Sequence, residues 1–214
     1  AVQKKHLHLI SPQKCVECVA ASTGNFQEGL AFERARFMEC LPSPQSKGLI
    51  HAFFGERAVA NIPEKKAQPR DIASIGVIGG GTMGSGISTS ALMAGLPVTL
   101  IEVSQEGLDR GVATITGNLD GSVKRGKMSQ EKRDAALAKL TASTEMESLA
   151  DVDLVIEAVF EKMEIKKEIF TKLDAICKEG AVLASNTSYL DVDEIAAMTK
   201  RPQDVLGLHF FSPA

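Results

Sequence analysis

An apolar strand that runs directly into a glycine turn and then into a helix is the feature that most constrains this chain. The turn has the G-x-G-x-x-G spacing at Gly79, Gly81 and Gly84. Gly79 allows a tight reversal out of the strand, Gly81 lets a pyrophosphate approach the backbone, and Gly84 lets the helix lie close to the sheet. The stretch therefore indicates a dinucleotide-binding turn, although glycine-rich turns also serve packing alone.

The helix after the turn completes this feature. It is expected to run from about Thr82 to Ala94, with Met83 in its first turn and Gly95 as its C-terminal stop. The free N–H groups of its first turn and the positive end of its dipole face the phosphates of a bound dinucleotide. Thr82 and Met83 are therefore candidate cofactor contacts.

Composition and charge exclude several classes of protein. The chain has 214 residues, which fits one or two domains, and 44% of them are hydrophobic and 24% charged. A net charge of −3 and the lack of a basic arm argue against a nucleic-acid partner. No apolar run approaches the roughly 18 residues of a membrane span, and there is no signal peptide. Because the first residue is Ala1, we expect a cut or processed start.

Four cysteines indicate a reducing compartment rather than a disulfide framework. They are Cys15, Cys18, Cys40 and Cys177. Cys15 and Cys18 form a lone C-x-x-C, with His6 and His8 upstream. A structural zinc site needs a second matched ligand pair, so the favoured explanation is one apolar face of a helix that starts near Ser11. We expect no metal.

Residues 1–70 are expected to be helical and contain no recognisable chemistry. Apolar residues recur at helical spacing from Phe26 to Leu41, which predicts an amphipathic helix, and another helix follows it. Residues 61–70 have the composition of a linker. We therefore expect a helical linker segment over residues 1–70 and a second domain over residues 71–214.

Strands alternate with helices from Ala73 onward, which predicts a parallel sheet covered by helices. The second strand ends at Glu102, 18 residues beyond Gly84 and near the offset of about 20 at which an acidic side chain reaches the adenosine ribose. A carboxylate there accepts hydrogen bonds from ribose hydroxyls and repels a 2′-phosphate. The sequence predicts a Rossmann-type doubly wound α/β fold that binds NAD rather than NADP; the alternative for Glu102 is a solvated strand end.

The segment of residues 104–140 is too long for one crossover helix and predicts an inserted helical hairpin, with Ser129 as the N-cap of its second helix. Lys124, Arg125 and Lys127 cluster at the bend. They are suited to an anionic ligand such as a phosphate, although a solvated charge cluster is the simpler explanation. Lys124 is therefore a candidate contact for a second ligand.

Three later strands are expected to deliver polar residues to the edge of the sheet where dinucleotides bind. The first leads to Glu161, and the helix after it carries Lys166, which either snorkels to water or points into the crevice. The second ends in Ser-Asn-Thr-Ser at residues 185–188. The third delivers His209, and the unperturbed histidine pKa of about 6.5 suits a general base. Taken alone, such a histidine is more often a packing residue.

Four motifs in combination resemble the NAD-binding domain of L-3-hydroxyacyl-CoA dehydrogenases. They are Gly-Gly-Gly-Thr-Met-Gly at residues 79–84, Glu-Ala-Val-Phe-Glu at 157–161, Ser-Asn-Thr-Ser at 185–188 and Gly-Leu-His-Phe-Phe-Ser-Pro at 207–213. The resemblance covers about residues 73–214. Residues 10–66 resemble the connecting segment of bifunctional β-oxidation enzymes, in which an enoyl-CoA hydratase/isomerase domain precedes the dehydrogenase.

This resemblance implies a reaction and residue roles. A 3-hydroxyacyl-CoA gives a hydride from C3 to NAD and becomes a 3-ketoacyl-CoA. His209 takes the hydroxyl proton, Ser188 hydrogen-bonds the substrate oxygen, and the hairpin at Lys124 meets coenzyme A. Beyond the glycine turn, the implied cofactor-binding residues are Glu102, Ala158, Val159, Glu161, Lys166 and Asn186.

The resemblance also implies a setting in fatty-acid β-oxidation. The parent enzyme would carry enoyl-CoA hydratase activity as well, act on acyl-CoA, and be monomeric or associate with a thiolase. It would lie in the cytoplasm of a bacterium or the peroxisome of a eukaryote.

Two departures from the family pattern leave alternatives open. Ser212 stands where many members have asparagine, a change compatible with the bifunctional branch. The chain stops at Ala214, before the family's histidine-orienting glutamate and its C-terminal domain, so we expect a truncated dehydrogenase. One alternative is therefore that this chain is a non-catalytic NAD-binding module. Another is that its parent is a related 3-hydroxy-acid dehydrogenase, because the histidine and Ser-Asn-Thr-Ser motifs are shared more widely than the substrate.

Overall fold

Six parallel strands form a single sheet in the computed structural model, which describes residues 9–63 and 65–212. They are β1 (Ile75–Ile78), β2 (Val98–Ile101), β3 (Leu140–Ser143), β4 (Leu154–Glu157), β5 (Val182–Ser185) and β6 (Val205–Gly207). Their order across the sheet is β3-β2-β1-β4-β5-β6, and every neighbouring pair is parallel. This is the doubly wound order, with its topological switch point between β1 and β4. The predicted Rossmann-type α/β fold is confirmed.

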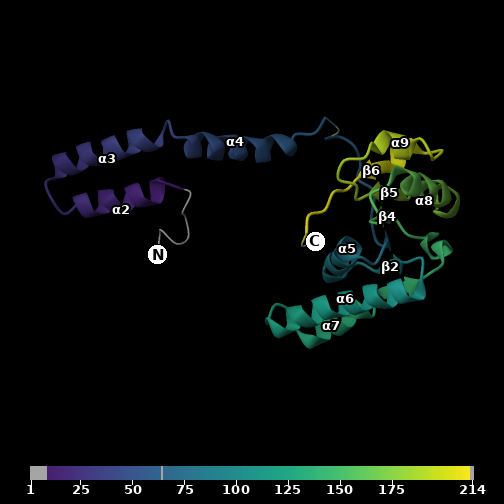
Figure 1. The fold of residues 1–214 in the computed structure, drawn as a ribbon. Coiled ribbons are helices and arrows are strands. Elements are labelled where there is room, and N and C mark those ends of the chain that lie inside the picture. The colour runs from purple at the N-terminus through teal and green to yellow at the C-terminus, as the bar shows by residue number, and fades with distance from the viewer. Residues whose placement is uncertain (1–8, 64, 213–214) are drawn as a thin grey trace. The chain divides into compact units, whose positions relative to one another are not determined.

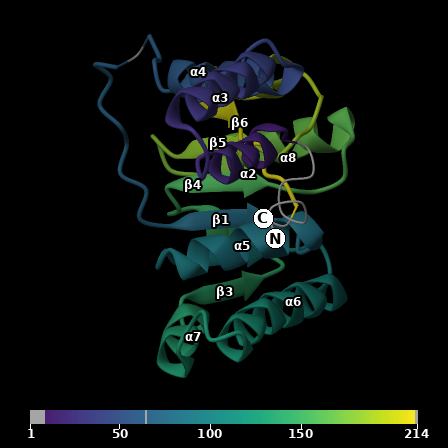
Figure 2. The same cartoon turned by 90° about the vertical axis from the view of Figure 1, so that its left-hand side faces the viewer.

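Helices cover both faces of the sheet (Figures 1 and 2). They are α5 (Thr82–Met93), α6 (Gln105–Lys124), α7 (Gln130–Leu137), α8 (Met163–Ile176) and α9 (Val192–Ala196). Because side chains alternate along a strand, Val77 and Ile78 of β1 enter different cores. Val77 packs in the cluster that contains Ile87 of α5, and Ile78 packs in the cluster that contains Phe170 of α8.

Strand β3 is the one element of the sheet that the sequence analysis missed. It pairs with β2 in the register Val98↔Leu140 and forms an edge of the sheet. Its four residues, Leu-Thr-Ala-Ser, are half-buried or exposed, so they lack the apolar run that marks the other strands. An edge strand gains its order from backbone pairing to one neighbour, which leaves a weak sequence signal.

Helix ends follow the expected capping chemistry. Ser129 caps α7 by accepting a hydrogen bond from the Lys132 N–H at 3.3 Å, and Asp191 caps α9 through the Asp193 N–H at 2.9 Å. Gly95, just beyond the end of α5, has φ +88°, a left-handed conformation that favours glycine. The predicted helical hairpin is therefore present as α6 and α7.

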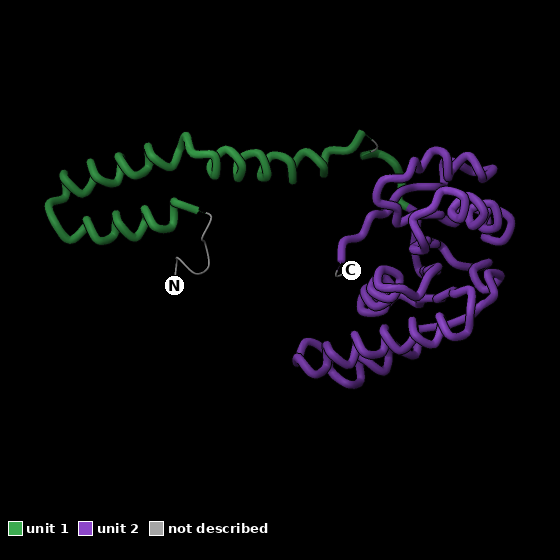
Figure 3. The backbone as a smooth tube through the Cα atoms, in the orientation of Figure 1, with its two compact units in different colours: residues 1–69 green, residues 70–214 purple. Residues whose placement is uncertain are grey.

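The chain divides into two units, Ala1–Pro69 and Arg70–Ala214 (Figure 3). The first contains α2 (Ser11–Ala21), α3 (Phe26–Cys40) and α4 (Pro44–Val59). Ion pairs that Lys14 and Arg36 make with Glu39, both at 2.9 Å, join α2 to α3 and brace the end of α3. None of the described residues in these three helices is buried, and Phe26 is 76% exposed. The predicted apolar stripe thus faces outward within this unit.

Two further sequence expectations concern membranes and metals. Among the described residues, no helix has the length and apolar character needed to cross a membrane. Cys15 and Cys18 lie on α2, whereas His6 and His8 lie outside the described residues.

Asp153 ties the starts of β1 and β4 together. Its carboxylate accepts hydrogen bonds from the Ala73 N–H and the Ser74 N–H, both at 2.9 Å, and from the Lys178 ammonium at 2.7 Å. The bond from Lys178, followed by those from Ala73 and Ser74, outweighs desolvation and lowers the pKa of Asp153 to about 2. The folded state therefore favours the ionised carboxylate.

Replacing Asp153 by asparagine should make the free energy of unfolding depend less on pH in the acid range. The pKa of Asp153 is lower in the folded protein than in the unfolded chain, so its carboxylate stabilises the fold above about pH 4, and this contribution fades as the pH falls through about 2. Urea unfolding should show Asp153→Asn less stable by about 2 kcal/mol at neutral pH and by about half as much near pH 3. Asp151→Asn, at an exposed neighbour, is the control. A loss that stays constant over this pH range would contradict the assignment.

Candidate functional site

The glycine turn has the conformation that its sequence predicts. Gly79 has φ +102°, and a Cβ there would lie 2.8 Å from the Ala158 carbonyl oxygen. A Cβ on Gly84 would lie 1.7 Å from the Gly79 carbonyl oxygen, so no larger residue fits between α5 and the turn. At Gly81 a Cβ would meet nothing within 4 Å, which leaves open space beside the backbone. The turn is therefore closed towards the sheet and open on its outer side.

The start of α5 has donors available for an anion. Gly81 is the N-cap residue and supplies no side-chain cap to the helix. Thr82 is exposed, and Met83 is half-buried against the core cluster of α5 and α6. A helix N-terminus without a side-chain cap presents backbone N–H groups and a positive dipole end to a ligand.

Glu102 lies against the glycine turn. Its carboxylate accepts a hydrogen bond from the Gly80 N–H at 2.7 Å and another from the Val103 N–H at 3.0 Å. The side chain is half-buried at the end of β2. Glu102 is therefore hydrogen-bonded to the backbone of the turn and is not a free strand end in solvent.

A cavity of about 620 Å³ opens from the turn and runs between α5 and α6. Polar side chains of α6 line one wall: Arg110, Thr114, Asn118 and Ser122, followed by Arg125. Thr82 and Ser212 also border it. The charges at the bend were predicted from the sequence, whereas this polar wall was not. The signal was present, because these α6 positions recur at three or four residues and so share one helix face.

The bend of the hairpin contributes Arg125 to the wall of this cavity. Lys124 is the last residue of α6, and Arg125 directly after it lines the cavity. Both side chains are exposed. The residues that line the cavity include the cationic Arg110 and Arg125 but not Lys124 itself.

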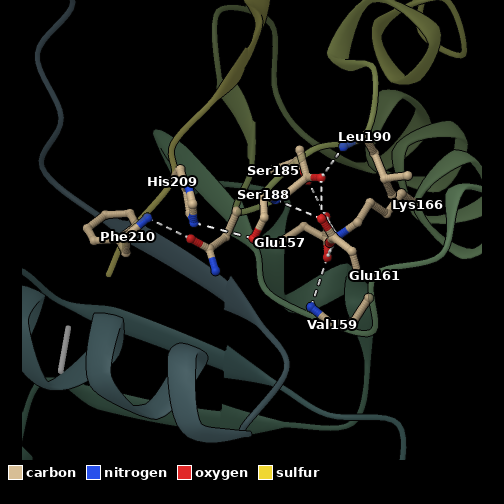
Figure 4. A network of polar contacts seen from close by, with 11 residues as sticks. Glu157, Val159, Glu161, Lys166, Ser185, Ser188, Leu190, His209 and Phe210 are labelled. Atoms are coloured by element: carbon tan, nitrogen blue, oxygen red, sulfur yellow. Dashed lines mark hydrogen bonds and ion pairs between the residues drawn. The ribbon is translucent and has the colours of Figure 1, made fainter. Parts of the chain in front are cut away.

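Ser188 and His209 meet at the carboxyl edge of the sheet (Figure 4). The Ser188 Oγ lies 3.3 Å from the His209 Nε2, and both residues are exposed. Ser188 follows β5 and His209 follows β6, so two neighbouring strand ends bring them together. Asn186 accepts a hydrogen bond from the Phe210 N–H at 2.8 Å through its side-chain oxygen, which ties the His209 segment to the end of β5.

A buried ion pair lies beside this hydroxyl–imidazole pair. Glu157, the last residue of β4, has no exposed surface, and Lys166 of α8 is 1% exposed. The Lys166 ammonium lies 2.8 and 2.9 Å from the two Glu157 oxygens and 3.3 Å from Glu161. Lys166 thus has two carboxylate partners and almost no surface left for a ligand.

Glu161 links the ion pair to Ser188. Its carboxylate accepts hydrogen bonds from the Thr187 hydroxyl at 2.6 Å and from the Ser188 N–H at 2.7 Å. Burial acts to raise the pKa of Glu161, but these two bonds and the Lys166 ammonium outweigh it, so the pKa is lowered. Glu161 is therefore ionised at neutral pH and remains partly exposed.

The predicted residues form two neighbouring groups around the switch point between β1 and β4. The first contains the glycine turn, Glu102, Ala158 and Val159, since a Cβ on Gly79 would touch both residues that follow β4. The second contains Glu161, Lys166, Asn186, Ser188 and His209. Pro213, the last residue of the fourth motif, lies outside the described residues. A parallel sheet places ligands at this edge.

Fold and sheet order together define a Rossmann-type α/β domain with an inserted helical hairpin. The family model described as "3-hydroxyacyl-CoA dehydrogenase, NAD binding domain" matches residues 74–214. The chain belongs to the 3-hydroxyacyl-CoA dehydrogenase family, as the four motifs predicted.

Curated relatives share nearly the whole chain. The peroxisomal fatty acid beta-oxidation multifunctional protein MFP2 of Arabidopsis thaliana is 37% identical over 215 residues, covering 99% of this chain and 30% of that protein. The peroxisomal bifunctional enzyme of Homo sapiens is 38% identical over 220 residues, covering 100% of this chain and 30% of that protein. The chain thus spans under a third of the length of these relatives.

Two solved structures are similar to about two thirds of this chain. The 3-hydroxybutyryl-CoA dehydrogenase of Escherichia coli is 41% identical, with a TM-score of 0.66, covering 68% of this chain and 31% of that one. M. tuberculosis FadB2 is 45% identical, with the same TM-score of 0.66, covering 67% of this chain and 51% of that one.

Proposed function

We propose that this chain binds NAD and that the protein at its natural length oxidises 3-hydroxyacyl-CoA to 3-ketoacyl-CoA. One observation carries the proposal: a hydroxyl and an imidazole, 3.3 Å apart, lie at the same sheet edge as an open glycine turn. A base for the substrate hydroxyl and a cradle for a dinucleotide are the two parts that such an oxidation needs.

The residues of the turn fit the proposed cofactor. The space beside Gly81 and the uncapped start of α5 suit a pyrophosphate, and Glu102 suits the adenosine ribose. Ala158 and Val159 would line the cofactor site beside Gly79. Glu161 and Asn186 would contact the cofactor, and Lys166 would act through Glu161, since it is buried beneath that residue.

His209 and Ser188 would act on the alcohol. Bound NAD would supply the acceptor for the hydride that leaves C3 of the substrate. The His209 Nε2 takes the proton of the C3 hydroxyl, and the Ser188 hydroxyl donates a hydrogen bond to the same oxygen, holding it in line. Hydrogen bonding of this kind fixes the oxygen close to the base, which is the geometry that proton transfer requires.

The remaining parts of the proposal concern the substrate and its setting. Coenzyme A would meet Lys124 at the end of α6 and the cationic groups of Arg125 and Arg110 in the cavity wall. The names of the relatives support fatty-acid β-oxidation in a multifunctional protein. Enoyl-CoA hydratase activity in the same protein is a further proposal. We propose a peroxisomal location in a eukaryote and a cytoplasmic one in a bacterium. Association with a thiolase is a further proposal.

Glu102→Gln should reduce the preference for NAD over NADP. Glutamine keeps an acceptor for the Gly80 N–H but removes the charge that repels a 2′-phosphate. Calorimetric titration of this chain should show NAD binding at least about tenfold tighter than NADP, and the ratio should fall several-fold in the variant. Glu168→Gln, the same change at an exposed position on α8, should leave the ratio unchanged. If Glu102→Gln left the ratio of NAD to NADP affinity unchanged, the adenosine ribose would not bind at Glu102.

Titration and assay together test the proposed function and its alternative. NAD binding by this chain, with NADH-dependent reduction of acetoacetyl-CoA by the protein at its natural length, is the expected result. NAD binding without turnover, both in this chain and in the protein at its natural length, would support a non-catalytic NAD-binding module. Turnover of simple 3-keto acids in preference to acetoacetyl-CoA would support a related 3-hydroxy-acid dehydrogenase.

A further inference from the structure

The Glu157–Lys166 pair is the most deeply buried charge in the described structure that the proposed reaction does not use directly. Each Glu157 oxygen has two donors: Lys166 with the Val159 N–H at 2.8 Å on one, and Lys166 with the Ser185 hydroxyl at 2.6 Å on the other. The carboxylate is thus fully occupied by protein groups.

Stability alone does not explain such a pair. Removing two charges from water costs several kcal/mol per ion, and replacing a buried pair by apolar residues is often neutral or stabilising. The neighbouring positions on α8 that face the core, Phe170 and Leu173, are apolar. A charged pair in this apolar layer therefore points to a role in geometry.

Contacts lead from the pair to Ser188 by two routes. On one, the Lys166 ammonium holds Glu161 at 3.3 Å, and Glu161 accepts the Ser188 N–H at 2.7 Å. On the other, Glu157 holds the Ser185 hydroxyl at the end of β5, three residues before Ser188. Figure 4 shows Glu161 between Lys166 and the Ser188 backbone.

We propose that Glu157 and Lys166 are positioning residues, which hold the Ser188 hydroxyl opposite His209 through Glu161 and Ser185. This inference rests on the proposed function of Ser188 and His209. It gives Lys166 a role in the placement of the substrate oxygen, through its two carboxylate partners. The pair therefore affects the rate of the chemical step more than the binding of NAD.

Neutralising both charges at once tests the proposal. In the protein at its natural length, Glu157→Gln with Lys166→Met removes the pair without leaving one buried charge alone. We expect kcat for acetoacetyl-CoA reduction to fall about 10- to 100-fold, as for a displacement of about 1 Å, with the KM for NADH within about threefold. Lys167→Met is the matched control, because Lys167 pairs with Glu194 at 2.9 Å on the same helix and lies outside this network. It should leave kcat unchanged.

Thr187 gives a second test that is milder for the fold. Its hydroxyl donates to Glu161 at 2.6 Å and accepts from the Leu190 N–H at 3.0 Å. Thr187→Val keeps the shape, removes the anchor of Glu161 and should lower kcat several-fold. Thr187→Ser keeps the hydroxyl and should restore kcat to within about twofold of wild type.

Different outcomes separate this inference from the proposed function. A wild-type protein without turnover would refute the function itself. With an active wild type, a folded double variant that keeps its kcat, or loses only its affinity for NADH, overturns the positioning role. If the double variant does not fold, equal kcat values for Thr187→Val and Thr187→Ser overturn it instead.

Discussion

His209→Ala in the protein at its natural length is expected to lower kcat for acetoacetyl-CoA reduction by roughly 100- to 10,000-fold. Removing a positioned general acid–base typically has an effect of this size. The affinity for NAD should change little, because the contacts of His209 are with Ser188 and Phe211 and not with the glycine turn. The His209 and Phe211 ring centroids lie 4.7 Å apart. Steady-state kinetics and NAD titration of the same preparation measure both quantities.

The control for this prediction is His51→Ala. His51 lies on α4, in the other unit, and is exposed. It should leave kcat unchanged. If His209→Ala retained more than about a tenth of the wild-type kcat, His209 would not be the base, and the observed contact with Ser188 would be structural.

Gly84→Ala is expected to remove NAD binding and most of the stability of the α/β unit. The added Cβ would lie 1.7 Å from the Gly79 carbonyl oxygen, and backbone atoms cannot give way without moving α5 off the sheet. Overpacking of a core typically costs about 1–3 kcal/mol, and this contact with backbone should lie at or above that range. Thermal unfolding and NAD titration provide the readouts.

Two alanine variants separate the effect on the fold from the effect on the ligand. Gly81→Ala meets no protein atom within 4 Å, so we expect normal unfolding together with weakened NAD binding, because the methyl group occupies the space of the pyrophosphate. Gly48→Ala on α4 also meets nothing within 4 Å and should change neither property. Normal NAD binding by Gly81→Ala would show that the pyrophosphate does not bind at this turn.

The turn and the two cores of the sheet could be predicted from the sequence because local rules decide them. Gly79 needs a positive φ, and an apolar strand buried on both faces reads as a continuous run, as in β1. The proximity of Ser188 and His209 could also be expected, since each follows a strand and parallel strands end at one edge.

Other features depend on tertiary contacts that the sequence pattern does not encode. β3 takes its order from pairing to β2, and its half-polar residues give no strand signal. The sequence left open whether Lys166 reaches water or the crevice; burial against Glu157 decided the matter. The polar residues of α6 recur every three or four positions, so the sequence indicates that they share one helix face. That this face lines a cavity opposite α5 follows only from the tertiary structure.

The most direct test of this account is hydride transfer between NADH and acetoacetyl-CoA by the protein at its natural length. We expect NADH consumption and formation of 3-hydroxybutyryl-CoA, much slower reaction with NADPH, and little reaction with acetoacetate in place of the thioester. No NADH consumption above the protein-free rate, in a preparation that binds NAD, would contradict the proposed dehydrogenase activity.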